Sequence, residues 1–386
     1  MDQQPRKRAA KLFHKKSRTG CQQCRNRRVK CDEAKPVCSH CNRLELPCTY
    51  GRAPSPKSES PVEAAVEPPE SESRRKLELG LFYQYMIDTG PSLVVDDATA
   101  HFWVTTSCRL ALKSDALLYA MYMVVALHTE HRSGLTDLEA SDTCRTYLNL
   151  ALHKHHKDVA EMSVQNIEYI CLTSSMLRIY GFVRLQGRSL QPYTPPVDWL
   201  RITGSSTAVF RQAWDLIKDK PKSVAYEMIE STSDFRDDNE SEELRRDLEH
   251  LMSREKPHEL EEPWDSETEA AYAGALNSIG GIWKALDSQR PAGGVGRRVV
   301  VFPMLLNKRF ADMVEEVRPR ALVILAHYFA LLAILSQVWW IGDSGPREVR
   351  AIAAILPDEW QGLLDWPKRI LQQHYVAVEN KDRDRA

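Results

Sequence analysis

Six cysteines within residues 21–48 could bind metal. They are spaced C-x2-C-x6-C-x6-C-x2-C-x6-C and comprise Cys21, Cys24, Cys31, Cys38, Cys41 and Cys48. A Cys-x2-Cys pair places two thiolates within reach of one ion, and a tetrahedral set of sulfur ligands favours zinc. Two four-coordinate ions need more ligands than six thiolates provide, so two sulfurs must bridge. The pattern predicts a binuclear cluster of two zinc ions. A disulfide framework is the alternative, but the N-terminal residues lack the apolar core of a signal peptide.

The cysteine pattern repeats after 17 residues, which predicts two similar halves. In each half, we expect a Cys-x2-Cys turn to open a short helix. Basic residues fill the first helix and its end: Arg25, Arg27, Arg28 and Lys30. At the places 17 residues further on, the second half carries Asn42, Leu44, Glu45 and Pro47. The first helix could therefore contact a polyanion, whereas the second resembles a packing element.

Charge is divided unequally along the chain. Residues 1–52 hold 14 Lys and Arg against 4 Asp and Glu, a net charge of +10, whereas the remainder carries −11. This asymmetry indicates nucleic acid as the partner of the N-terminal end. Residues 1–20 form a basic arm that includes Lys16 and Arg18. We expect this arm to act in nuclear import and phosphate contact; the alternative is a solvated tail.

Residues 21–50 resemble the fungal binuclear zinc-cluster transcription factors, through the six cysteine spacings, the basic run before Cys31 and Pro36 in the connecting loop. The resemblance implies a nuclear regulator of RNA polymerase II transcription that binds double-stranded DNA with its first helix in the major groove. Its base-reading pair falls on Arg27 and Arg28, and we expect a CGG-like or TCG-like element. The other expected DNA contacts are Arg18, Lys16, Arg25 and Lys30, and the expected bridging ligands are Cys21 and Cys38. A zinc module that binds RNA or protein remains an alternative.

The rest of the chain is expected to be a linker followed by an all-α regulatory domain. Residues 51–73 are rich in Pro, Ser and Glu, which is typical of a disordered linker. Residues 74–386 show helical periodicity, with helices expected near 97–113, 115–132, 163–186, 303–317 and 346–373. Capping signatures occur at Thr136 with Glu139 and at Ser266 with Glu269. Prolines and a Gly-Ser-Ser run predict an irregular segment at 188–206.

The most apolar run, residues 321–341, is long enough to suggest a membrane span, but polar residues interrupt it. We therefore expect a buried helix and no membrane span. Isolated Cys108, Cys144 and Cys171 are expected in the core.

A second resemblance, to the sterol uptake control branch of the same family, rests on the segments QPYTPPVDWLRITG and LAHYFALLAILSQVWW together with the zinc-cluster region. It implies control of sterol, lipid or secondary-metabolite genes, an apolar ligand such as a sterol near the 321–341 helix, and ligand-controlled nuclear entry. Co-regulators or the transcription machinery are expected partners. The sequence leaves monomer or homodimer open. It contains no G-x-S-x-G, P-loop, H-E-x-x-H or dinucleotide motif, so we expect no catalytic residues and no enzyme.

Overall fold

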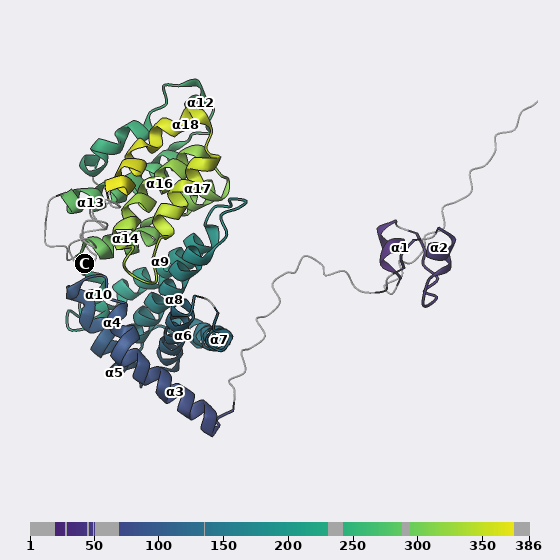
Figure 1. Cartoon of the computed structure of the whole chain (residues 1–386), viewed down its shortest axis with the longest axis horizontal. Coiled ribbons are helices and arrows are strands. Elements are labelled where there is room, and N and C mark those ends of the chain that lie inside the picture. Colours follow the sequence, from purple (N-terminus) through teal and green to yellow (C-terminus); the bar gives the residue numbers. More distant parts are fainter. Residues whose placement is uncertain are drawn as a thin grey trace, which may run out of the picture. The chain divides into compact units, whose positions relative to one another are not determined.

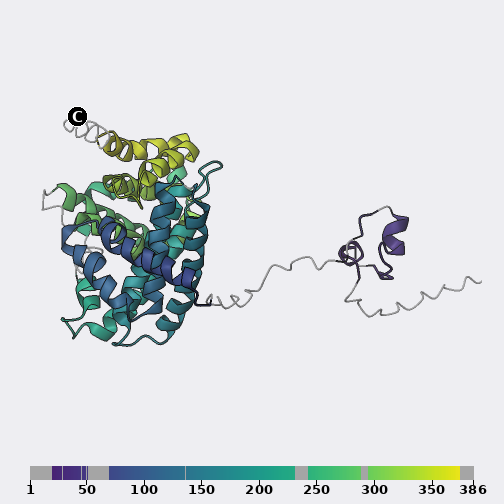
Figure 2. The same ribbon diagram turned by 60° about the horizontal axis from the view of Figure 1, so that its bottom comes forward.

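The computed structural model describes residues 20–27, 29–44, 46–48, 50, 69–134, 136–230, 242–287 and 294–373. The chain divides into two compact units, residues 1–64 and 65–386. The described residues form helices joined by loops and contain no strand, as the ribbon views show (Figure 1; Figure 2). A small metal-binding module with an all-α domain is the fold class predicted from the sequence. The predicted domain boundaries remain predictions, because the linker lies largely outside the described residues.

The first unit contains two five-residue helices, α1 (Gln22–Asn26) and α2 (Ser39–Arg43). Its buried centre consists of five of the six cysteines, with Leu46, Cys48 and Tyr50 partly buried against them. So few residues cannot form a hydrophobic core that is sufficient by itself, and domains of this size usually need metal or disulfides to fold. The local sequence therefore makes the fold of this unit dependent on its sulfur ligands.

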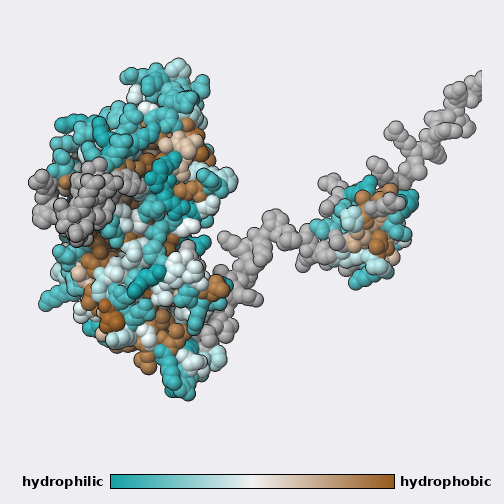
Figure 3. All heavy atoms as spheres, in the orientation of Figure 1, coloured by the Kyte–Doolittle hydropathy of each residue, from teal (hydrophilic) through white to brown (hydrophobic). Residues whose placement is uncertain are grey.

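The second unit is a helical assembly. Its longer helices are α3 (Glu72–Gln84), α6 (Asp115–Arg132), α7 (Leu138–Ala160), α8 (Ile167–Gly187), α9 (Val197–Ile217), α13 (Ser266–Asp287), α14 (Val295–Leu305), α16 (Pro319–Leu332) and α17 (Ser344–Ile355). Shorter elements are α5 (Ser107–Ala111), α10 (Val224–Glu230), α12 (Pro257–Leu260), α15 (Lys308–Glu315), α18 (Asp358–Gln361) and the 3-10 helix η5 (Glu242–Met252). Helix α6 packs against α7 and α8, α8 against α9, α13 against η5, and α16 against α17. The visible face is mostly hydrophilic with scattered hydrophobic patches (Figure 3).

Helix α16 forms the centre of this core. Every residue from Arg320 to Leu332 is buried, and Tyr328 stacks on Phe302 with ring centroids 4.2 Å apart. The expected buried helix is confirmed, although it ends at Leu335 after a 3-10 turn and not at residue 341. Among the described residues, no single helix meets the length and hydropathy of a membrane span; α15 and residues 319–335 do so only as a pair bent by 109°.

Several local predictions need correction. Helix α9 runs through Gly204 and the following serines, where we expected irregular structure. Glycine costs about 1 kcal/mol in a helix, but α9 packs along α8 and α14 and this packing outweighs the local preference. The caps of α7 and α13 lie one residue away from the expected positions: Asp137 accepts from Ala140 N–H at 2.9 Å and Asp265 from Thr268 N–H at 2.7 Å.

Of the other predicted helices, one is confirmed with its bounds and two are each divided into shorter helices. The helix at 115–132 is confirmed with the expected bounds. The 303–317 segment is divided between α14 and α15, because Leu306 and Asn307 adopt extended conformations and the Asn307 side chain caps α15. The 346–373 segment is likewise interrupted after Ile355. Cys144 and Cys171 are buried as expected, but Cys108 is only half-buried.

Candidate metal centre and nucleic-acid interface

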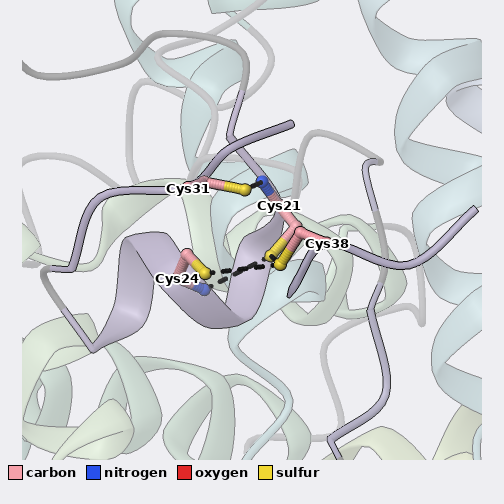
Figure 4. Close-up of side chains that lie close together, drawn as sticks. All are labelled: Cys21, Cys24, Cys31 and Cys38. Atoms are coloured by element: carbon pink, nitrogen blue, oxygen red, sulfur yellow. Dashed lines mark hydrogen bonds between the residues drawn. The ribbon is translucent and has the colours of Figure 1, made fainter. Parts of the chain in front are cut away.

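The six cysteine sulfurs form two overlapping groups of four. One contains Cys21, Cys24, Cys31 and Cys38, and the other Cys21, Cys38, Cys41 and Cys48; within each, the Sγ atoms lie within 4.8 Å of one another. Figure 4 shows the first group, in which the sulfur of Cys24 points from α1 toward those of Cys21 and Cys38. Cys21 and Cys38 belong to both groups, which is the arrangement that two bridging ligands require.

The sulfur spacing fits zinc. The Sγ atom of Cys38 lies 3.7 Å from that of Cys21 and 3.7 Å from that of Cys24, and the Sγ atoms of Cys21 and Cys41 are 3.5 Å apart. Four sulfurs at the usual Zn–S distance of about 2.3 Å form a tetrahedron with edges of about 3.8 Å. The cysteines are therefore arranged as zinc ligands and not as disulfides, and bound zinc would tie the two halves together and fix the orientation of α1.

The 17-residue repeat is visible in the backbone. The N–H of Cys24 donates to the sulfur of Cys21 at 3.5 Å, and the N–H of Cys41 donates to that of Cys38 at 3.4 Å. The N–H of Cys21 donates to Cys31 Sγ at 3.4 Å, and the N–H of Cys38 to Cys48 Sγ at 3.3 Å. Each pair of bonds is related by the same shift of 17 residues. The two halves predicted from the sequence thus have matching local geometry.

The same contacts act on the thiol pKa values. Burial raises the pKa of Cys24 and raises that of Cys41 to about 12. Backbone N–H groups lower the pKa of Cys38 and Cys48, because they donate to the thiolate form. Zinc binds thiolates, so metal binding must release protons from the buried thiols and must weaken as the pH falls.

The connecting loop is held by polar contacts to the second half. The carboxylate of Asp32 accepts from the Ser39 N–H at 3.2 Å and from its hydroxyl, at the start of α2. The Ser39 hydroxyl is the main cause that lowers the pKa of Asp32. Tyr50 donates to the Ala34 carbonyl oxygen at 2.7 Å, so the chain just after Cys48 is bound to the same loop.

The predicted DNA contacts are only partly within the described residues. Arg27 and Lys30 are exposed at and beyond the end of α1, and the backbone of Arg25 lies within α1. Arg28, Arg18 and Lys16 lie outside the described residues. Arg43, on α2 of the other half, is also exposed. The structure therefore leaves two of the expected contacts, Arg27 and Lys30, accessible to a partner beside α1.

The helical unit contains a large cavity that the sequence did not reveal. It measures about 1320 Å³ and is lined mainly from α8, α9, α13, α14 and α15. Of the 321–341 run, Trp340 alone lines it, so the pocket expected near α16 lies instead beside α8 and α9. The one signal in the sequence was the cation Arg178, which interrupts the apolar stretch of α8 between Ile167 and Val183.

Comparison with known proteins decides the family. The fungal Zn(2)-Cys(6) binuclear cluster domain matches residues 19–58. The Zn(2)-C6 fungal-type transcription factor afumD of Aspergillus fumigatus is 30% identical over 345 residues, which cover 84% of this chain and 87% of that protein. The chain belongs to the Zn(2)-C6 fungal-type transcription factors. This zinc-cluster factor therefore binds two zinc ions and DNA, regulates transcription in the nucleus and is not an enzyme.

Other relatives show how far the likeness extends. A Zn(2)-C6 fungal-type transcription factor of Gibberella zeae is 24% identical over 438 residues, 92% of this zinc-cluster factor and 86% of that protein. Sterol uptake control protein 2 of Candida albicans is 43% identical over 67 residues, only 17% of this chain and 9% of that protein. The likeness to afumD is long enough to include much of the helical unit, whereas the likeness to the sterol regulator can include only a small part of it.

Proposed function

We propose that this zinc-cluster factor is a sequence-specific regulator that recognises a guanine-containing, CGG-like or TCG-like element. Arg27 and Arg28 would read guanines in the major groove, because an arginine can hydrogen-bond to both O6 and N7. Lys30, Arg25, Arg18 and Lys16 would contact phosphates and fix the register. In the metal centre, Cys21 and Cys38 would be the bridging ligands.

The difference between two geometrically matched halves is the observation that carries this proposal. Both halves repeat the same N–H to sulfur bonds, yet exposed Arg27 and Lys30 follow α1, where the second half has Leu44 and Pro47. Two scaffolds of one geometry with different side chains indicate that one half contacts DNA and the other supports it. The net charge of +10 over residues 1–52 supports the same assignment.

Binding of duplexes that vary one base pair at a time tests these roles. Arg27→Ala and Arg28→Ala should each relax preference at one position by about 1–3 kcal/mol. Lys30→Ala should weaken binding equally on all sequences and lower the salt slope by about 0.9. Arg43→Ala removes an exposed cation from the other helix and serves as the matched control. Relaxed preference in Lys30→Ala, or in Arg43→Ala, would show that the roles are wrong. Tighter binding to RNA, with equal affinity for every duplex, would favour the alternative of an RNA-binding module.

We further propose that the helical unit regulates the DNA-binding unit in response to an apolar ligand, with ligand-controlled nuclear entry as the mechanism. The cavity of about 1320 Å³ supports this role, since small-molecule sites usually need about 300–1,000 Å³ and the cavity has room for such a ligand. The target genes would then serve sterol, lipid or secondary metabolism. Nuclear localisation measured with and without added lipid tests the proposal; an unchanged distribution would contradict it.

Co-regulator binding and homodimer formation are also proposed for the helical unit. Apolar side chains that are exposed on α3 and its π-helical continuation, Tyr85–Thr89, support an interaction there: Leu79, Tyr83, Met86 and Ile87. Light scattering of the purified chain tests the homodimer, and a monomer at micromolar concentration would leave the surface to a co-regulator.

A further inference from the structure

The cavity in the helical unit contains a cation without a counter-ion. Arg178 lies on α8 and lines the cavity. Its Nη2 donates to Ser175 Oγ at 3.0 Å, its Nη1 contacts Met304 Sδ, and its guanidinium lies 5.3 Å from the ring centroid of Phe210. Its Nε is buried and has no hydrogen-bond partner. The polar contacts of this guanidinium thus leave a donor unused.

No carboxylate within the described part of the chain pairs with Arg178. Three other arginines of this unit, each largely buried, show the contrast: Arg188 pairs with Glu348, Arg297 with Asp96 at 2.9 Å, and Arg320 with Glu262 at 2.7 Å. Burial lowers the pKa of Arg178 to about 10, and the group that opposes this shift is the thiol of Cys171 and not a carboxylate. The guanidinium still carries its charge at neutral pH, so it is a partly buried cation without a carboxylate partner.

An uncompensated charge inside a protein is strongly unfavourable, and the usual remedy is a hydrogen-bonded partner of opposite sign. The cavity leaves room for such a partner to come from outside. Cations outnumber carboxylates in its lining: Arg211 and Lys308 are exposed, Arg201 is paired with Glu315 at 2.8 Å, Arg297 is paired with Asp96, and Asp312 is the other carboxylate. The exposed cations would attract an anion to the cavity, and Arg178 would form an ion pair with it.

Apolar side chains line the same cavity as Arg178, and they indicate that most of the ligand is apolar. Ile179, Phe182, Leu200 and Trp340 line the same cavity and are each almost completely buried. A small inorganic anion would leave this surface uncovered, and a neutral sterol would leave the guanidinium uncompensated. Only a molecule with both an acidic head and a long apolar body satisfies both parts of the wall.

We propose that the cavity binds an anionic amphiphile, a long-chain carboxylic acid whose carboxylate pairs with Arg178 and whose chain lies against the apolar wall. The inference deepens the ligand-sensing role proposed above and rests on it for its regulatory consequence, whereas binding itself can be measured without reference to DNA. A carboxylate matches the planar guanidinium fork, which can donate two parallel hydrogen bonds to it.

Calorimetric titration of the full chain with dodecanoate and with dodecan-1-ol tests the inference. The two probes share the apolar chain and differ in head-group charge. The native protein should bind the acid about tenfold to a hundredfold more tightly than the alcohol, since a hydrogen bond to a charged group adds that much affinity. Arg178→Met should abolish this preference and leave alcohol binding unchanged, whereas Arg178→Lys should retain part of it.

Arg201→Gln is the matched control, because it removes a cavity arginine that already has a carboxylate partner. This variant should keep the preference for the acid. Equal binding of acid and alcohol by the native protein, absence of binding by both, or an undiminished preference in Arg178→Met would overturn the inference. Ergosterol bound more tightly than dodecanoate would also overturn it, in favour of a neutral ligand. Sequence-specific DNA binding by the same preparations reports on the DNA-reading proposal separately, and lipid-independent localisation despite acid binding would overturn only the sensing role.

Discussion

Replacing Cys38 by serine should weaken both zinc sites, whereas replacing Cys24 or Cys41 should weaken one. The prediction follows from the two overlapping sulfur groups: Cys38 belongs to both, Cys24 only to the first and Cys41 only to the second. Serine preserves the volume of the side chain, but its hydroxyl remains protonated near neutral pH and is a poor zinc ligand. Cys24 and Cys41 occupy equivalent positions 17 residues apart and are therefore internal controls for each other.

The size of the effect can be estimated from the ligand count. A structural zinc site has an apparent binding free energy of about 10–16 kcal/mol, so each of four ligands contributes about 2.5–4 kcal/mol. Loss of one thiolate should then weaken the affected site by a factor of about 10² to 10³. Cys38→Ser leaves three cysteines in each group, whereas Cys24→Ser leaves three in one and four in the other.

Competition with a chromophoric chelator measures this difference. The native chain should release its zinc in one range of chelator concentration. Cys24→Ser and Cys41→Ser should release one ion at a lower concentration and one near the native concentration, while Cys38→Ser should release both at the lower concentration. The assignment of the shared ligands would be refuted if Cys38→Ser kept one ion with native affinity. It would also be refuted if Cys24→Ser and Cys41→Ser each lost both ions at the lower chelator concentration.

Three further predictions concern stability. Glu262→Gln should lower the free energy of unfolding by about 3–5 kcal/mol in urea denaturation, because it leaves the completely buried Arg320 without its carboxylate; a loss below about 1 kcal/mol would contradict this role. Burial lowers the pKa of His327 and His155 from 6.5 to about 4, so the unfolded chain binds more protons between these values. The free energy of unfolding should then fall by about 2 kcal/mol per histidine from pH 7 to pH 5. His155→Gln should make this decrease smaller, and an unchanged pH profile in that variant would contradict the account. Zinc chelation should abolish DNA binding while the thermal unfolding of the separate helical unit stays unchanged; a large shift in that transition would show coupling of the two units.

The metal centre was predictable because its information is local. Six residues of one type, repeated after 17 positions, define ligand chemistry without knowledge of distant contacts. The matching N–H to sulfur bonds at Cys24 and Cys41 follow directly from that repeat. The exposed cations beside α1 were equally accessible to reasoning, because the sequence places them between two ligands.

The cavity could not be predicted in the same way. Arg178 differs from Arg188 and Arg320 only in whether a carboxylate from a distant segment approaches it: Glu348 and Glu262 reach the latter two from far along the chain. Such contacts depend on how the helices pack. The continuation of α9 through Gly204 was missed for a similar reason, since tertiary contacts outweigh a local preference of about 1 kcal/mol.

The matched halves of the metal centre have a consequence for how the protein is made. Each half contributes three sulfurs, and each group of four borrows one from the other half. During synthesis, a nascent chain that has emerged only as far as Cys31 has no complete metal site, and the second site stays open until Cys48 leaves the ribosome. Metal capture therefore has two stages for this unit, since the first group is complete when Cys38 emerges and the second only at Cys48. A chain cut within the connecting loop yields two pieces that are both unable to hold zinc with four sulfurs.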